Sequence, residues 1–199
     1  ASVAFAAPST AGFPATHIGQ DAATVHDIGV RMDVLVDPGH RLVLDDVMRP
    51  DAPWSAIARP TPNFGFTSNA YWFRFQIHND TAAPLERVLE LPVPFLDDLQ
   101  LFHRVANTTV AQFALGDEKP FAQRAVRHQN FVMPLTLQPG ANAFYVRLAS
   151  AGTIEAGFRL WSRNAFLAES NNDNLAQGAV VGVLLVMIAA GLAAMALLL

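Results

Sequence analysis

The sequence contains no cysteine, a single lysine and few charged residues of either sign. The absence of cysteine excludes a disulfide scaffold, a thiol nucleophile and thiolate zinc sites. Of the 13 basic residues only Lys119 is a lysine; the arginines are scattered along the chain, and the net charge is −4. This is not the composition of a nucleic-acid-binding protein. Charged residues make up 15% and hydrophobic residues 52% of the 199 positions, which excludes intrinsic disorder.

Catalytic motifs are also missing. The sequence has no Gly-x-Ser-x-Gly, no phosphate-binding loop, no His-Glu-x-x-His and no dinucleotide fingerprint. Its histidines are His17, His26, His40, His78, His103 and His128. They show no metal-ligand spacing. Adjacent acids on a strand point to opposite faces, so neither Asp45-Asp46 nor Asp97-Asp98 is expected to form a catalytic pair.

The two ends of the chain indicate a membrane protein. Residues 178–199 contain no charged residue, and a helix over 175–199 would be about 37 Å long, enough to cross a hydrocarbon core of about 30 Å. We expect this segment to be a transmembrane helix of a longer membrane protein. The flank 169–177 holds two acids and no base, which is typical of the outer side of a membrane. Residues 1–27, which contain Ala4-Phe5-Ala6, are interpreted as a signal-peptide remnant or a disordered leader.

Between these ends the apolar and polar residues alternate, with turn residues roughly every 8 to 15 positions. The clearest strand, 71–78, places aromatic and aliphatic side chains on one face and Trp72 and Arg74 on the other. Further strands are expected over 30–36, 41–47, 85–91, 99–104, 108–114, 131–137, 143–149 and 154–161. Residues 138–142 are expected to form a hairpin loop.

About eight or nine strands with short turns predict an all-β domain over 28–166, an antiparallel jelly roll or β-sandwich. A barrel is the alternative architecture. A juxtamembrane linker over 167–174 and the transmembrane helix over 175–199 would follow the domain.

Two groups of polar residues are candidates for ligand binding. The indole face of Trp72 suits the C–H side of a sugar ring, and the guanidinium of Arg74 offers fixed donors to hydroxyls or carboxylates. The alternatives are a core tryptophan and an arginine paired with a carboxylate. The second group lies in the loop from Gly116 to His128. The alternative interpretation of this segment is a charged surface loop without a binding role.

Gly65 followed by Tyr71-Trp72-Phe73-Arg74 resembles the Gly-x-x-x-x-x-Tyr-Trp-hydrophobic-Arg signature of one extracellular domain type. This domain type belongs to the bacterial seven-transmembrane receptors with diverse intracellular signalling modules. The resemblance continues through Leu91-Pro92, Leu96–Phe102, Gly116-Asp117, Pro120-Phe121, Arg124, His128, Phe131-Val132, Tyr145–Leu148 and Leu160-Trp161. It covers residues 30–190, and the order and spacing of the motifs make it specific.

The resemblance implies a periplasmic jelly roll that senses a carbohydrate-like small molecule at the bacterial inner membrane. The output module would lie in the cytoplasm, outside this chain, so the chain itself is expected to be neither catalytic nor dependent on a cofactor. Within the site, we expect Trp72 to stack on the ligand and Arg74 and Arg124 to donate hydrogen bonds, with Asp117 and His128 beside them. The partners expected are the ligand and the membrane, and a homodimer is compatible with the resemblance. The net charge of −4 argues against nucleic acid as a partner.

Two alternatives remain open. The first is a calcium-responsive or protein-interaction module. Calcium binds six to eight oxygens. Its candidate ligands are Asp80, Asp97, Asp98, Asp117 and Glu118. The second is a membrane-anchored glycan-active enzyme, which would need two carboxylates facing each other at about 5–9 Å.

Overall fold

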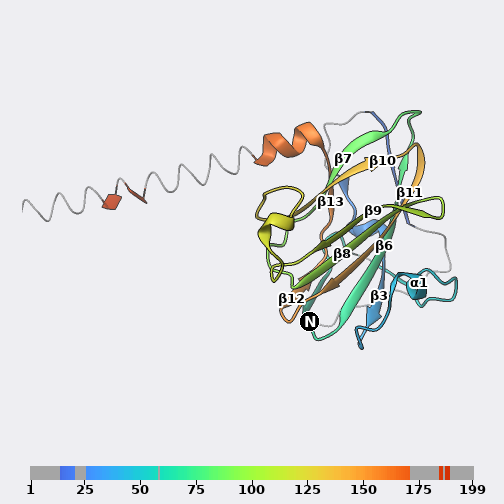
Figure 1. The fold of residues 1–199 in the computed structure, drawn as a ribbon, viewed down its shortest axis with the longest axis horizontal. Helices are drawn as coiled ribbons and strands as arrows, with labels where there is room; N and C mark the ends of the chain where they lie inside the picture. The colour runs from blue at the N-terminus through green and yellow to red at the C-terminus, as the bar shows by residue number, and fades with distance from the viewer. Residues whose placement is uncertain (1–13, 21–25, 58, 171–183, 186, 189–199) are drawn as a thin grey trace, which may run out of the picture. The chain divides into compact units, whose positions relative to one another are not determined.

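The structure, a computed structural model, describes residues 14–20, 26–57, 59–170, 184–185 and 187–188. The chain divides into two units, residues 1–162 and 163–199. All the strands of the described residues lie in the first unit (Figure 1). In the second unit residues 163–170 are helical, as are 184–185 and 187–188.

The larger sheet of the first unit is built around a long strand, β6. Its strands are β1 (Ala15–Ile18), β3 (Asp33–Asp37), β4 (Ser55–Ala56), β6 (Ala70–Asn79), β8 (Asp98–Val105), β9 (Thr108–Leu115) and β11 (Gly140–Ala149). They follow the order β4-β3-β6-β11-β8-β9. One edge of β6 is shared, because β3 pairs antiparallel with residues 70–74 and β1 pairs parallel with residues 76–79. The other edge pairs with β11.

A second sheet covers the inner face of the first. It contains β10 (Phe131–Leu137), β7 (Leu85–Leu91), β13 (Arg159–Ser162) and β2 (His26–Asp27) in that order. A short pair, β5 (Asn63–Phe66) with β12 (Thr153–Glu155), completes the domain. Alternate side chains from both sheets, such as Phe75 of β6, Leu89 of β7 and Phe131 of β10, form one buried core. The expected antiparallel β-sandwich is confirmed.

The outer face of the larger sheet is partly covered as well. A second buried cluster joins Leu35, Val47, Trp54, Trp72 and Tyr145. Val47 ends the short helix α1 (Leu44–Val47), and its carbonyl accepts a hydrogen bond of 3.0 Å from Trp54 Nε1. The segment between β3 and β4 therefore folds over this face and buries side chains that alternation alone would leave in solvent.

Three expected elements differ from the structure. Residues 41–47 form no strand: the carboxylate of Asp37 accepts bonds from the backbone N–H groups of Arg41 and Leu42, and the chain then turns into α1. The segment 154–161 is divided between β12 and β13, which pair in different sheets. Residues 138–142 do not close a hairpin, because β10 pairs with β7 whereas β11 pairs with β6 and β8. This connection crosses from one sheet to the other.

The remaining expectations have mixed outcomes. Strands over 85–91 and 131–137 are confirmed with the expected bounds. The strand expected from residue 30 begins at Asp33, after a 3-10 helix, η1 (Gly29–Arg31). Residues 15–18, expected to belong to a leader, form β1 and bury Thr16 and Ile18. Residues 26–27, also expected in the leader, form β2 and pair with β13. Apart from residues 14, 19 and 20, the rest of the expected leader is outside the described residues.

The helix expected over 175–199 also lies outside the described residues, except at positions 184, 185, 187 and 188. In the part of the chain that is described, no helix combines the length and the apolar character needed to cross a membrane.

Candidate functional site

A pocket of about 420 Å³ opens on the outer face of the larger sheet, beside the segment that leads into α1. We call it the outer-face pocket. It is lined by His40, Leu42, Val43, Leu44, Trp72, Gln100, Phe102 and Arg147. The sheet register explains its floor: Arg147 of β11 pairs with Trp72 of β6 on one side and with Gln100 of β8 on the other. Residues opposite each other on neighbouring strands point to the same face, so these three side chains form a row.

Two polar side chains of the pocket, Arg147 and Gln100, are held by Asp98. Its Oδ2 accepts hydrogen bonds from Arg147 Nη1 at 2.6 Å and from Gln100 Nε2 at 2.9 Å, and its Oδ1 accepts one from Lys119 Nζ at 2.7 Å. Burial alone would raise the pKa of Asp98, but the hydrogen bonds from Lys119 and Gln100 and the charges of Lys119 and Arg147 together hold this pKa below its usual value. The carboxylate is therefore ionised at neutral pH and fixes the donors of Arg147 and Gln100 in place.

Trp72 is placed differently from the sequence-based expectation. Its side chain is only 1% exposed and lies against Phe102, with the ring centroids 6.1 Å apart and the planes 17° from parallel. The indole therefore cannot be an open stacking platform, because α1 and the segment before it cover the face on which it lies. Trp72 still contributes to the wall of the outer-face pocket, and its Nε1 is buried with no acceptor among the described residues.

Arg74 lies on the same face of β6 but is engaged by the sheet itself. Its Nε and Nη2 both donate to Asp33 Oδ2, at 2.9 and 2.8 Å. Its guanidinium lies 4.7 Å from the centre of the Trp54 ring. The Asp33 side chain is 1% exposed, so this is a buried ion pair. Arg74 therefore pairs with a carboxylate, as the alternative interpretation of the sequence expects.

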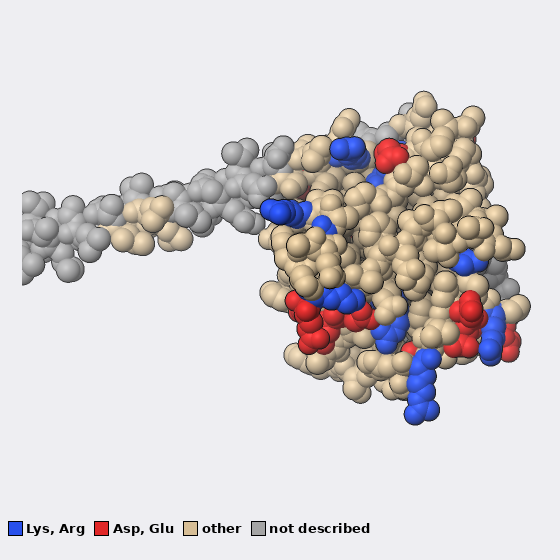
Figure 2. Space-filling model, in the orientation of Figure 1, with Lys and Arg blue, Asp and Glu red and all other residues tan. Residues whose placement is uncertain are grey.

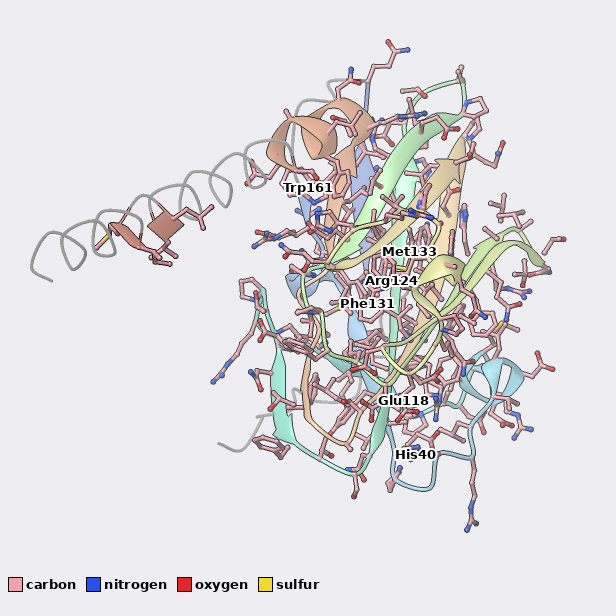
Figure 3. All side chains as sticks on the ribbon, turned by 60° about the vertical axis from the view of Figure 1, so that its left-hand side comes forward. His40, Glu118, Arg124, Phe131, Met133 and Trp161 are labelled. Atoms are coloured by element: carbon pink, nitrogen blue, oxygen red, sulfur yellow. The ribbon has the colours of Figure 1, made fainter. Side chains whose placement is uncertain are left out.

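Arg124 organises the loop that carries the other predicted residues. Its guanidinium lies over the rings of Phe121 and Phe131, at 4.9 and 4.5 Å, and Figure 3 shows it beside Phe131. Its Nη1 donates to the carbonyl oxygens of His128 and Gln129 at 2.8 and 3.0 Å. These contacts close the loop on itself and tie it to β10.

The other two predicted residues of this loop have backbone contacts. His128 Nδ1 accepts a bond of 3.1 Å from the backbone N–H of Asn130. Asp117 is exposed, and its backbone N–H donates to the Leu96 carbonyl at 2.8 Å. Of the five predicted ligand-binding residues, only Trp72 lines the outer-face pocket.

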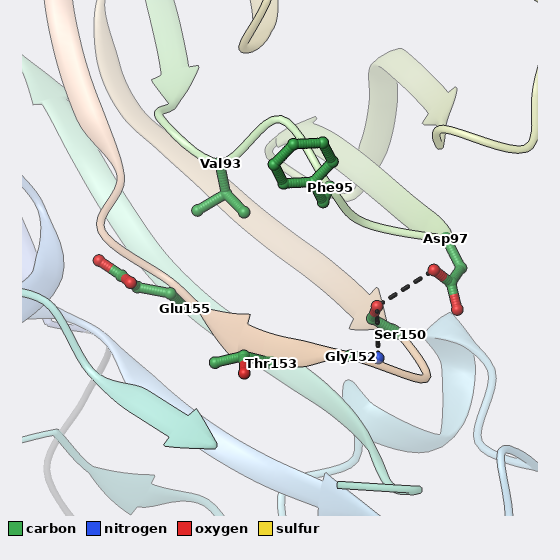
Figure 4. Close-up of a pocket in the computed structure, with 7 residues that line it drawn as sticks. All are labelled: Val93, Phe95, Asp97, Ser150, Gly152, Thr153 and Glu155. Atoms are coloured by element: carbon green, nitrogen blue, oxygen red, sulfur yellow. Dashed lines mark hydrogen bonds between the residues drawn. The ribbon is translucent and has the colours of Figure 1, made fainter. Parts of the chain in front are cut away.

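A second pocket, of about 380 Å³, is shown in Figure 4. It is lined by Val93, Phe95, Asp97, Ser150, Gly152, Thr153 and Glu155. Asp97 accepts bonds from Ser150 Oγ at 3.1 Å and from the backbone N–H of Ala151 at 2.7 Å. Phe95 is 74% exposed, and Phe66, which pairs with Thr153, is 86% exposed. Two exposed aromatic rings beside a mainly apolar pocket are a feature of interaction surfaces.

The calcium candidates are spread over several places. Asp97 lies in the second pocket, Asp98 binds Lys119 and Arg147, and Asp117 and Glu118 are exposed in the loop. Over the face in Figure 2, acidic and basic side chains are interspersed.

Asp80, the fifth calcium candidate, has different neighbours. Among the described residues, the only group of His, Cys, Asp or Glu side chains placed to share an ion is His17, His78 and Asp80. Sequence reasoning missed it because His17 and His78 are distant in the chain. They are brought together by the parallel pairing of β1 with β6, and no sequence motif predicts this pairing.

The comparisons with known proteins identify the family. Residues 29–162 match the family described as 7TMR-DISM extracellular 2. The chain belongs to this family. The resemblance seen in the sequence is thereby confirmed, and the domain is the extracellular sensor of a membrane receptor, outside the cytoplasm. The family is one of sensor domains rather than catalytic ones. No curated protein matches the chain.

The 7TMR-DISM extracellular 2 match runs from η1 to β13 and includes both pockets. It does not include β1, and so His17 lies outside it.

Proposed function

We propose that this sensor domain binds a carbohydrate-like small molecule in the outer-face pocket. The domain would lie in the periplasm of a bacterium, and binding would reach a cytoplasmic output module through helices of the inner membrane. A ligand can shift such a receptor only if it binds one of its two states more tightly than the other.

The observation that carries the proposal is the row of Trp72, Arg147 and Gln100 at the base of the pocket. Sugars present hydroxyl groups around the ring and C–H groups on its faces, so their sites combine fixed donors with aromatic walls. Asp98 holds Arg147 and Gln100 in fixed positions, and Phe102 supplies an aromatic wall. The volume of about 420 Å³ falls in the range of small-molecule pockets, roughly 300–1,000 Å³.

The Trp72 indole supports the same assignment. A buried N–H without an acceptor is uncommon in folded proteins, and it is costly unless another group bonds it. Trp72 lines this pocket together with Arg147, its partner in the sheet register. A hydroxyl oxygen of the ligand would give the indole N–H an acceptor.

A second candidate function is recognition of a protein partner at the second pocket. It is favoured by the exposure of Phe95, which lines this pocket, and of Phe66, which pairs with Thr153 of the pocket. This is the protein-interaction alternative raised by the sequence.

Thermal unfolding of the full chain with a panel of mono- and oligosaccharides tests the proposal. The detergent must have no sugar headgroup, because maltosides or glucosides would compete for the site. A sugar at 100 times its dissociation constant stabilises the folded state by about 2.7 kcal/mol. We expect Gln100→Ala to weaken the binding of such a sugar about two- to tenfold, the worth of one hydrogen bond.

Gln76→Ala is the matched control, since Gln76 lies on the same outer face but does not line the pocket. Equal binding by both variants would remove the outer-face pocket from the proposal. A panel with no effect on unfolding, combined with saturable binding of a partner protein that Phe95→Ser abolishes, would favour the second candidate.

A further inference from the structure

The far end of strand β6 carries a cluster that the proposed function does not use. Strand β1 runs parallel to β6 there, and the register places His17 directly beside His78. The pairing continues one step further, because the backbone N–H of Asp80 donates to the Ile18 carbonyl at 2.9 Å. Backbone pairing thus fixes the positions of the Cα atoms of the cluster, which consists of His17, His78 and Asp80.

The side chains converge on one carboxylate oxygen. Asp80 Oδ1 lies 2.9 Å from His17 Nδ1 and 2.7 Å from His78 Nδ1. The two imidazole rings have centroids 4.8 Å apart, and one ligand atom from each residue lies within 4.8 Å of the other two.

We propose that His17, His78 and Asp80 form a binding site for a divalent transition-metal ion of the zinc type. Two imidazole nitrogens with one carboxylate oxygen suit zinc and its neighbours in the first transition row, whereas calcium takes six to eight oxygens. Ligands about 2.0–2.1 Å from a tetrahedral zinc ion lie about 3.3 Å from one another. The nitrogen–oxygen distances of 2.7 and 2.9 Å are close to this value, and small side-chain rotations would admit the ion.

The surroundings allow such rotations. The side chains of His17, His78 and Asp80 are 63%, 36% and 46% exposed, so an ion can enter directly from solvent and complete its coordination with water. The ion would join residue 17 to residue 80 and so attach β1 to β6. Strand β1 precedes the residues 29–162 that match the family.

Metal titration of the full chain tests the proposal. The protein carries a purification tag without histidine, is stripped with a chelator, and is titrated with Zn²⁺ by calorimetry and with Co²⁺ by its visible absorption. We expect one ion per chain and a Co²⁺ spectrum typical of nitrogen and oxygen ligands. His17→Ala and Asp80→Asn should each weaken binding about tenfold or more, since even residues that only support ligands contribute 10–100-fold.

Asp80→Asn keeps an oxygen that can accept the histidine hydrogen bonds, so its loss of affinity separates metal binding from simple hydrogen bonding. Asp45→Asn, at an exposed aspartate of α1, is the control and should bind as the wild type does. Circular dichroism confirms that each variant is folded. Wild-type protein that binds neither ion at millimolar concentration, or binding that His17→Ala and Asp80→Asn leave unchanged, would overturn the proposal. Calcium that displaces Zn²⁺ at equal concentration would do so too.

Discussion

Replacing Arg74 by methionine leaves the carboxylate of Asp33 in a buried position without its cation. Both guanidinium bonds to Asp33 Oδ2, at 2.9 and 2.8 Å, are lost, while the Asp33 side chain remains 1% exposed. Removing one partner of a buried ion pair destabilises a protein by about 3–5 kcal/mol, because the other charge stays in a medium of low dielectric. The contact of Arg74 with the Trp54 ring adds about 0.5–2 kcal/mol to the loss.

Urea unfolding of the full chain, followed by tryptophan fluorescence, measures this loss. With an m-value of about 2 kcal/mol/M, a change of 3–5 kcal/mol lowers the midpoint by about 1.5–2.5 M. The double variant Arg74→Met with Asp33→Val should recover most of the stability, since replacing both members of a buried pair by apolar residues is often neutral. A single variant as stable as the wild type would refute the structural role of Arg74, and a double variant no better than the single one would refute the uncompensated charge as the cause.

Two further predictions concern packing and pH. A Cβ at Gly29 would overlap the Pro60 carbonyl oxygen, so Gly29→Ala should lower the free energy of unfolding by about 1–3 kcal/mol and the melting temperature by several degrees. A Cβ at Gly19 would have no atom of the described residues within 4 Å, so Gly19→Ala should melt as the wild type does. Equal melting of the two variants would contradict the contact. Burial lowers the pKa of His103 below 6.5, and the hydrogen bond to Asn142 opposes this shift with a smaller effect. Below pH 6.5 the unfolded state therefore binds more protons than the folded state, and the free energy of unfolding decreases as the pH falls. His103→Gln should reduce this loss in melting curves between pH 7.5 and 5.5, and parallel curves for the two proteins would argue against it.

The strands were predictable where alternation and burial agree. In β7 and β10 the apolar residues face a core that both sheets share, and local pattern was sufficient to find them. The segment 41–47 has a similar pattern, but the Asp37 carboxylate takes the backbone N–H groups of Arg41 and Leu42 and turns the chain away. A side-chain bond of this kind has no periodicity, so the pattern could not indicate it.

The candidate site was predictable only in part, for the same physical reason. Alternation placed Trp72 and Arg74 correctly on the face of β6 opposite the main core. It could not show that Trp54 and α1 cover that face, which makes Trp72 a buried wall and gives Arg74 an aromatic neighbour. Arg147 and Gln100 were missed as pocket residues because their position depends on the register of β11 with β6 and β8.

The parallel strand β1 has a practical consequence for anyone who expresses this domain. It occupies the edge of β6 over residues 76–79, where β3 no longer pairs, and it buries Thr16 and Ile18. A protein trimmed to the family limits at residue 29 would lack this strand and leave the backbone N–H and C=O groups of that edge unpaired. Unpaired strand edges recruit other chains, so such a fragment would aggregate or dimerise edge to edge. An oligomer formed by that fragment would therefore result from the truncation and would not be evidence for the oligomeric state of the receptor.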